Sequence, residues 1–205
     1  MITQDSDVLI VIDVQNDFCP NGALAVQHGD EVVPLINEMS SKFEHVVLTQ
    51  DWHPAGHSSF ASSHPGKHPF ETTELDYGVQ VLWPNHCVQG SSGAEFHPGL
   101  NLNDVEMIIR KGFRKDIDSY SAFFENDHKT PTGLTGYLRT RGFSRVFLAG
   151  LATDYCVAYS AIDARREGFD VVVIEDACRA INLDGSLNQA MHDMQQASVS
   201  LIASL

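Results

Sequence analysis

The feature that most constrains the fold is an alternation of short, wholly apolar runs with segments of helical periodicity. The apolar runs are rich in Val, Ile and Leu, which is typical of strands that are buried on both faces. We expect strands at 8–12, 46–48, 105–109, 146–148, 171–174 and 199–202. The alternation predicts an α/β fold, with a parallel sheet covered by helices on both faces.

Helices are expected in the segments between these strands, and the 205 residues suit a single domain, 1–205. Thr130 followed by Pro131 is typical of a helix N-terminus, and Gly168 of a helix end. The helices are expected at 30–41, 130–141, 153–167 and 187–196. One long segment, 52–103, has no clear periodicity and holds six of the ten histidines. We interpret it as an irregular insertion that carries a metal or substrate site.

The composition excludes some classes of partner. Twenty-seven acidic residues against 13 basic ones give a net charge of −14, which disfavours binding to nucleic acid. No apolar stretch approaches the roughly 20 residues of a membrane span, and the N-terminus has no basic and apolar leader. The four cysteines form no CxxC pair, so we expect free thiols, a soluble chain and a cytoplasmic location.

Cys156 is the strongest candidate for a reactive group. It lies just after the strand that ends near Gly150, where a helix is expected to begin at Thr153. Unpaired backbone N–H groups and the positive end of the helix dipole favour a thiolate at such a position, and the same amides can hold an oxyanion. A small buried apolar role is the alternative, because most free cysteines have that role. Cys178 follows a strand without a comparable helix start.

Asp13 and Lys111 each follow a predicted strand. Asp13 comes directly after the first strand and Lys111 after the strand at 105–109. Sites in parallel α/β folds lie at the carboxyl ends of strands. Asp13 is therefore a candidate general base and Lys111 a candidate for stabilising a thiolate. A capping carboxylate and a solvated lysine remain the alternatives.

Asp51 and His53 follow the second strand and form a candidate metal site. Side chains at i and i+2 of an extended segment point the same way, and this pair suits zinc, iron or manganese. His57 and His86 are further candidates, and three protein ligands with open positions would be a catalytic type of site. We interpret the remaining histidines of the insertion as surface residues: His64, His68 and His97.

These residues together resemble the nicotinamidase/pyrazinamidase branch of the isochorismatase-like cysteine hydrolases. The resemblance spans nearly the whole chain, and the DxH and WPxHC segments are specific to the nicotinamidase branch. The matching segments are IDVQNDFCPNGALAV (12–26), TQDWHPAGHSSF (49–60), WPNHCVQGSSGAEFHP (83–98), RKGFRKDIDSYSAFF (110–124) and GLATDYCVAYSA (150–161). It implies a three-layer, Rossmann-like α/β/α fold with a six-stranded, mostly parallel sheet.

The resemblance also implies roles for individual residues. The catalytic triad would be Asp13, Lys111 and Cys156. The ligands of one divalent metal, zinc in the first place and iron or manganese otherwise, would be Asp51, His53 and His86, with His57 or Ser59 as a further contact. Phe18, Trp83 and Tyr120 would pack around the substrate ring. A cis peptide at Leu151–Ala152 would turn the Ala152 N–H towards the site, and the Ala152 and Cys156 amides would form the oxyanion hole.

The implied reaction is hydrolysis of nicotinamide to nicotinate and ammonia through a cysteine thioester, in NAD salvage. Pyrazinamide would be hydrolysed to pyrazinoate. The expected partner is a small-molecule substrate, with no nucleic acid and no membrane, and the chain could be a monomer or a homo-oligomer. Three alternatives stay open: a metal-independent amidohydrolase for carbamoyl or ureido substrates, an isochorismatase, and a non-catalytic metal-binding or redox protein. The isochorismatase branch lacks the nucleophilic cysteine.

Overall fold

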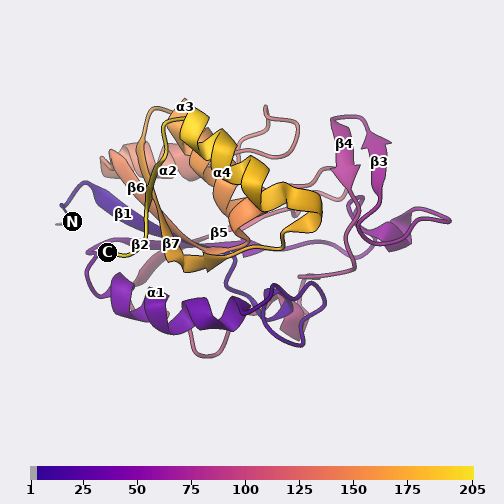
Figure 1. Cartoon of the computed structure of the whole chain (residues 1–205), viewed down its shortest axis with the longest axis horizontal. Coiled ribbons are helices and arrows are strands. Elements are labelled where there is room, and N and C mark those ends of the chain that lie inside the picture. Colours follow the sequence, from indigo (N-terminus) through magenta and orange to yellow (C-terminus); the bar gives the residue numbers. More distant parts are fainter. Residues whose placement is uncertain (1–3) are drawn as a thin grey trace.

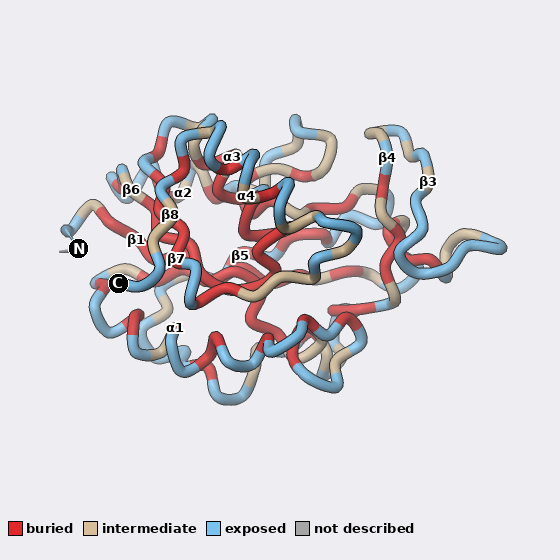
Figure 2. Tube along the Cα trace, in the orientation of Figure 1, coloured by how far each residue is buried: buried red, intermediate tan, exposed pale blue. Residues whose placement is uncertain are grey.

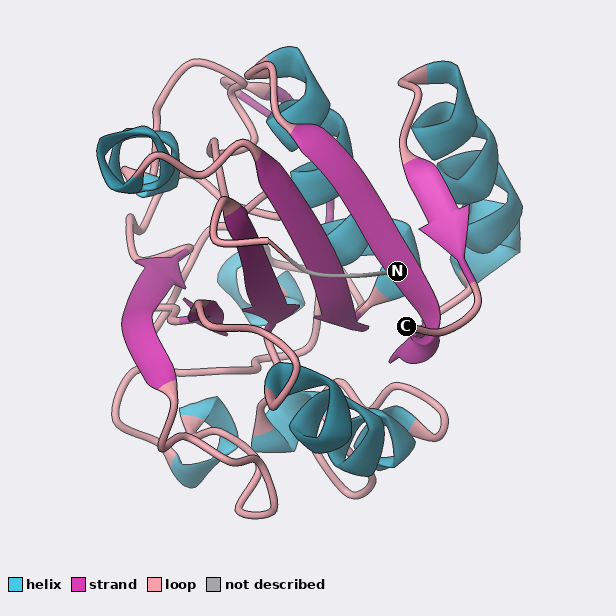
Figure 3. Cartoon of the chain, turned by 90° about the vertical axis from the view of Figure 1, so that its left-hand side faces the viewer, coloured by secondary structure: helices cyan, strands magenta, loops and turns pink. Residues whose placement is uncertain are grey.

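The computed structural model describes residues 4–205 as three layers, with helices on both faces of a central sheet (Figures 1 and 3). The strands within this range are β1 (Asp7–Ile12), β2 (Val46–Asp51), β3 (Thr72–Leu75), β4 (Gly78–Val81), β5 (Val105–Lys111), β6 (Arg145–Leu151), β7 (Asp170–Arg179) and β8 (Ser200–Ile202). The α-helices are α1 (Val32–Ser40), α2 (Leu134–Arg141), α3 (Ala158–Arg166) and α4 (Ser186–Gln196). The predicted α/β/α class and the six-stranded sheet are confirmed.

The central sheet has the strand order β5-β2-β1-β6-β7-β8, and every neighbouring pair is parallel. From β1, the chain continues to β2 on one side of the sheet, whereas β6 lies on the other side. The order therefore reverses between β1 and β6. In open parallel sheets, the carboxyl ends of the strands at such a reversal form the crevice in which ligands bind.

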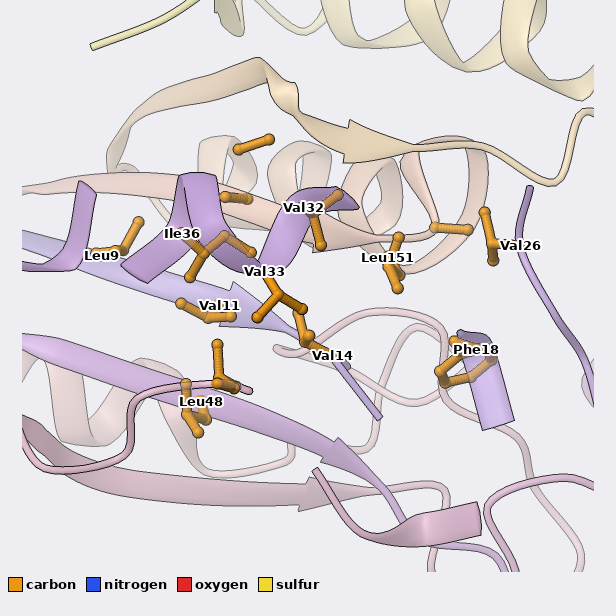
Figure 4. Close-up of a cluster of buried hydrophobic side chains, with 14 of the residues drawn as sticks. Leu9, Val11, Val14, Phe18, Val26, Val32, Val33, Ile36, Leu48 and Leu151 are labelled. Carbon is orange, nitrogen blue, oxygen red and sulfur yellow. The ribbon is translucent and has the colours of Figure 1, made fainter. Parts of the chain in front are cut away.

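Strands β1 and β2 are buried along their whole length and β6 is buried after its first residue, because both faces of the sheet are covered (Figure 2). In β1, side chains alternate between the faces: Leu9 and Val11 pack on the side of α1, and Val8 and Ile10 on the other side. Figure 4 shows Val32, Val33 and Ile36 of α1 over Leu9, Val11 and Leu48. Helices α2, α3 and α4 cover the opposite face.

The prediction that a helix begins at Thr130–Pro131 is wrong. Helix α2 begins at Leu134 and is preceded by Gly133 with φ at 107°. Pro131 forms an antiparallel bridge with Phe124 instead. This bridge, between residues seven apart in sequence, holds the chain extended over the residues that the Thr-Pro pattern assigned to a first helical turn.

The insertion at 52–103 is less irregular than expected. It contains an antiparallel hairpin of β3 and β4, which extends away from the central sheet in Figure 1. Its strands have four residues each, which is too short for a clear alternation in the sequence. Strand β7 is also longer than predicted, and it contains Cys178 rather than ending before it. No helix within residues 4–205 is long and apolar enough to cross a membrane.

Candidate active site

The chemistry-bearing residues of four strands meet where the strand order reverses. Asp13 follows β1, and Cys156 follows β6 in a π-helical turn, Thr153–Val157, that leads into α3. Asp51 is the last residue of β2, and Lys111 is the last residue of β5. Parallel strands bring these ends to one edge of the sheet, so residues far apart in sequence become neighbours.

The Lys111 ammonium lies at the centre of this group and is almost completely buried. Its Nζ is 2.8 Å from Asp13 Oδ2 and 2.9 Å from Asp51 Oδ1. It also donates to the Ser119 carbonyl at 2.9 Å and lies 3.4 Å from the Cys156 sulfur. The predicted grouping of Asp13, Lys111 and Cys156 is thus present in the structure.

Charge compensation decides the protonation of this buried group. Burial disfavours the Lys111 ammonium, but Asp13 and Asp51 outweigh burial and raise the pKa of Lys111 well above its ordinary value. The lysine is therefore charged at neutral pH. Burial raises the pKa of Asp13, and the charge of Lys111 only partly opposes this effect. A carboxylate with a raised pKa is better suited to accept and return a proton near neutral pH.

Thr49 orients Asp13. Its Oγ1 donates to Asp13 Oδ1 at 2.6 Å, and the Asp13 N–H donates to the same Oγ1 at 3.1 Å. Thr49 is itself completely buried in β2. The sequence analysis missed this residue, although a signal was present: Thr49 is two residues before Asp51 and therefore on the same face of the strand.

The Cys156 thiol is buried, and its pKa is shifted in the direction opposite to the one that a helix start alone would give. Burial raises the pKa of Cys156 well above its ordinary value, Asp13 and Asp51 add to the rise, and only Lys111 opposes it. The helix start alone therefore does not decide the pKa of this thiol, because burial and two carboxylates act against a thiolate. Cys156 is a protonated thiol at neutral pH, and its proton has to leave when the sulfur attacks.

The backbone before Cys156 has the expected cis peptide bond between Leu151 and Ala152. The Ala152 carbonyl accepts from the Tyr155 and Val157 N–H groups, each at 3.1 Å. Gly150 has φ at 125°, and a Cβ there would lie 2.1 Å from the Ile12 carbonyl oxygen. Only glycine fits such a close approach of β6 to β1.

Asp51, His53 and His86 converge beside this group. Asp51 Oδ2 is 2.9 Å from His53 Nε2 and 3.2 Å from His86 Nε2, and all three residues are buried. Two atoms that bind the same ion at about 2.0–2.1 Å lie about 3 Å apart, which agrees with these separations. Asp51 is held ionised, because His53 and Lys111 outweigh burial and lower its pKa well below the ordinary value.

Hydrogen bonds orient both histidine rings for metal binding. His53 Nδ1 lies 2.9 Å from the Gly112 carbonyl, and His86 Nδ1 lies 2.8 Å from the Pro84 carbonyl. A carbonyl can only accept, so both Nδ1 atoms carry a proton and both Nε2 atoms face Asp51. Gly112 also permits close packing, since its φ is 65° and a Cβ would lie 2.5 Å from the His53 ring. The residues thus fit a divalent metal ion with two nitrogen ligands and one oxygen ligand.

His57 and Ser59 interact with each other. His57 Nδ1 is 2.7 Å from Ser59 Oγ, and His57 Nε2 is 3.2 Å from the Ile117 carbonyl. The His57 ring also packs against the His53 ring, with centroids 4.3 Å apart and the planes tilted by 42°. Burial and the neighbouring His53 lower the pKa of His57, so its ring is neutral. In this arrangement His57 supports the His53 ring.

A small cavity joins the Cys156 region to the metal-binding residues. The predicted ring-binding residues Phe18, Trp83 and Tyr120 all line it, together with Tyr155. The rings of Trp83 and Tyr155 pack edge to face, with centroids 4.9 Å apart. About 20 Å³ is free inside this cavity, which is about the space of one water molecule.

A larger groove of about 820 Å³ lies between α3 and α4. It shares Tyr155 with the smaller cavity, but it has neither Cys156 nor the metal-binding residues in its lining. We therefore place the candidate active site in the smaller cavity. Cys19, Cys87 and Cys178 are free buried thiols.

The fold and this site define a cysteine hydrolase on a parallel α/β/α scaffold, with a buried thiol beside a lysine and two carboxylates. The chain belongs to the isochorismatase domain family, whose model matches residues 7–204. It is 55% identical over 196 residues to a nicotinamidase of Acinetobacter baylyi, covering 96% of this chain and 92% of the relative. It is 45% identical to a nicotinamidase of Escherichia coli, with 85% of this chain and 84% of that protein covered.

Solved structures of related enzymes have the same fold. A nicotinamidase/pyrazinamidase from an Acinetobacter species has a TM-score of 0.97 and 58% identity, with 98% of this chain and 97% of that chain covered. An L. infantum protein in complex with nicotinate has a TM-score of 0.86 and 41% identity, with 98% and 95% covered. A Pyrococcus horikoshii pyrazinamidase in complex with zinc has a TM-score of 0.77 and 35% identity, with 96% and 98% covered.

Proposed function

We propose that this chain hydrolyses nicotinamide to nicotinate and ammonia, and likewise pyrazinamide to pyrazinoate. The proposal is supported by the related nicotinamidases, which match over nearly the whole chain, and by the related structure that contains nicotinate. The reaction recovers the pyridine ring for NAD salvage. The observation that carries the proposal is the position of Lys111, which contacts Asp13, Asp51 and Cys156 at one cavity.

In the proposed mechanism, Cys156 is the nucleophile and Asp13 is the general acid and base. Asp13 takes the thiol proton as the sulfur attacks the carboxamide carbon. The Lys111 ammonium stabilises the negative charge that develops on the sulfur. Asp13 then gives the proton to the leaving nitrogen, the C–N bond breaks, and ammonia departs. The thioester that remains is hydrolysed by a water molecule that Asp13 deprotonates, which releases nicotinate and restores the thiol.

The oxyanion of each tetrahedral intermediate is proposed to lie between the backbone N–H groups of Ala152 and Cys156. Such preorganised donors each contribute about 3 kcal/mol to stabilising a developing oxyanion. Thr49 keeps Asp13 in place during both proton transfers through the 2.6 Å hydrogen bond. Lys111 remains charged while Asp13 carries the proton, because the Asp51 carboxylate lies 2.9 Å from its Nζ and does not take part in the proton transfers.

We propose that Asp51, His53 and His86 hold one divalent metal ion, with zinc in the first place and iron or manganese otherwise. The ion would supply a Lewis acid that binds the pyridine nitrogen of the substrate. Phe18, Trp83 and Tyr120 would pack on the ring and hold the carboxamide towards Cys156. His57 and Ser59 would support the His53 side of the site.

We also propose a cytoplasmic location and a small-molecule substrate as the only partner that the reaction needs. Four free thiols support a reducing compartment. The net charge of −14 disfavours nucleic acid as a partner.

One assay tests the proposal. Ammonia release from nicotinamide is measured with and without a chelator, beside a ureido compound as an alternative substrate. We expect hydrolysis of nicotinamide, loss on chelation and recovery with zinc. Hydrolysis of the ureido compound alone, unaffected by the chelator, would instead identify a metal-independent amidohydrolase.

The covalent step is tested with Cys156→Ala. This variant should lose turnover but still bind nicotinate, whereas the matched Cys178→Ala should keep its activity. Nicotinamide hydrolysis by Cys156→Ala would disprove the role of the thiol as nucleophile.

A further inference from the structure

Asp118 is a buried carboxylate for which the proposed reaction has no role. It lies in the segment that follows β5, is 2% exposed, and lines the same cavity as Cys156 and the metal-binding residues. Its Oδ1 is 3.9 Å from His53 Nε2. The Asp118 carboxylate, His53 and His57 also offer ligand atoms that lie within 4.8 Å of one another. Asp118 therefore lies directly beside the metal-binding residues, on the His53 side of the group.

The carboxylate of Asp118 is held firmly in this position. Its Oδ1 accepts from the Ser119 N–H at 2.8 Å, and its Oδ2 accepts from Gln80 Nε2 at 2.9 Å. Gln80 belongs to β4 and is 1% exposed. The Gln80 Oε1 accepts in turn from Tyr77 and Asn126, so the hairpin of the insertion fixes Asp118 through one amide.

The same amide connects Asp118 to the residues around the ring. Gln80 Nε2 lies 2.9 Å from the Tyr120 hydroxyl oxygen, which also accepts from Trp83 Nε1 at 3.2 Å. One amide group therefore hydrogen-bonds both to Asp118, beside the metal-binding residues, and to Tyr120, one of the residues proposed to pack on the substrate ring. That amide belongs to the hairpin, outside the central sheet.

The carboxylates near the metal-binding residues are paired unequally. Asp13 and Asp51 share the Lys111 ammonium at 2.8 and 2.9 Å, whereas the ion pair that Asp118 forms among the described residues is the 3.9 Å approach to His53 Nε2. A buried carboxylate is costly unless it is paired, and a divalent cation held beside His53 would be a closer partner for Asp118.

We propose that Asp118 is a positioning residue of the metal site. Its carboxylate lies outside the three direct ligands, strengthens binding of the divalent ion, and orients the molecules bound at the coordination positions that the protein leaves open. This inference rests on the proposed metal site. The 3.9 Å separation from His53 Nε2 is longer than the 2.9 and 3.2 Å separations among Asp51, His53 and His86, so Asp118 acts from outside that set. Hydrogen-bonded partners outside the direct ligands commonly set metal affinity.

The test is the zinc affinity of metal-stripped protein, measured by competition with a chromogenic chelator. Asp118→Asn should bind zinc about 10- to 100-fold more weakly than the wild type. Asp116→Asn is the matched control, because it removes the same charge from an exposed position two residues away. It should bind zinc as the wild type does. Asp118→Glu keeps the charge and should recover part of the affinity.

Thermal unfolding of the same metal-free variants separates metal binding from a general structural effect. We expect zinc to raise the Tm of Asp118→Asn less than it raises the Tm of the wild type. This difference should be larger than the difference between the Tm values of the two metal-free proteins. Equal zinc affinity of Asp118→Asn and Asp116→Asn would overturn the proposal. If Asp118→Asn does not fold, Asp118→Ser decides, since it also removes the carboxylate and wild-type zinc affinity in this variant would overturn the proposal. Absence of zinc binding by the wild type would overturn the metal site itself.

Discussion

Asp51 and Lys111 are register partners at the carboxyl ends of β2 and β5, and their side chains form an ion pair with Oδ1 and Nζ 2.9 Å apart. The same ammonium contacts Asp13 and the Cys156 sulfur. One buried lysine thus joins the residues proposed for the chemistry to a residue proposed for metal binding. A change at Lys111 is therefore expected to affect both.

Replacement of Lys111 by methionine should destabilise the metal-free protein. The change leaves Asp13 and Asp51 buried without their cation, and removal of one partner from a buried ion pair costs about 3–5 kcal/mol. Urea unfolding measures this loss, with the exposed Lys115→Met as the control. The double variant Asp13→Asn, Lys111→Met should recover part of the loss. A Lys111→Met variant as stable as Lys115→Met would contradict the assignment of Lys111 as the charge-balancing group.

Replacement of Asp13 by asparagine should make the thiol more acidic while activity is lost. Burial and then the charge of Asp13 hold the pKa of Cys156 up, and only Lys111 opposes them. Without the Asp13 charge, Lys111 stabilises the thiolate more effectively, so the pKa falls. At a fixed neutral pH, the metal-free variant should therefore be alkylated by iodoacetamide faster than the metal-free wild type.

The pH profile of alkylation measures the direction in which the pKa of Cys156 shifts. The rate of alkylation rises as pH rises through the thiol pKa, and the rise should start at lower pH in Asp13→Asn than in the wild type. Turnover of nicotinamide by the variant should fall at least about 100-fold, because a general base contributes about 10²- to 10⁴-fold. A thiol pKa that rises in the variant would show that Asp13 does not face the sulfur as a charge.

Replacement of His86 by alanine should remove the metal but leave the thiol intact. His86 Nε2 is one of the three atoms that converge on the proposed ion, and its loss leaves two ligands. We expect at least about a 10-fold loss of zinc affinity. Metal content by elemental analysis and alkylation of Cys156 give the two readouts. The exposed His68→Ala is the control, and it should keep both the metal and the activity.

Replacement of Thr49 by valine should lower kcat with little change in metal content. The variant is nearly isosteric but removes the hydroxyl that donates to Asp13 at 2.6 Å. The Asp13 backbone N–H also loses its acceptor. We expect about a 10-fold lower kcat, since an interaction of this kind contributes about 1.5 kcal/mol or more when one partner is charged. The exposed Thr72→Val is the control, and an unchanged kcat in Thr49→Val would show that Asp13 needs no such support.

Much of the architecture could be predicted from local pattern. The continuous apolar runs indicated strands buried on both faces, and a parallel sheet follows because helices have to cover both faces. The grouping of Asp13, Lys111 and Cys156 was also predictable, since the carboxyl ends of parallel strands meet at one edge. The start of the second helix was predicted wrongly, because Pro131 forms a bridge with Phe124 instead of opening the helix.

The sequence by itself determined the sheet, its two covered faces and the strand ends at which reactive residues stand, because apolar periodicity is a local property of the chain. Only the tertiary structure decided the relation of Asp51 to Lys111, the support of Asp13 by Thr49, and the approach of Asp118 to His53. These contacts join segments that are apart in sequence, and no local pattern carries their distances. The protonation of Cys156 also depended on the fold, since burial and two carboxylates outweigh the lysine that opposes them.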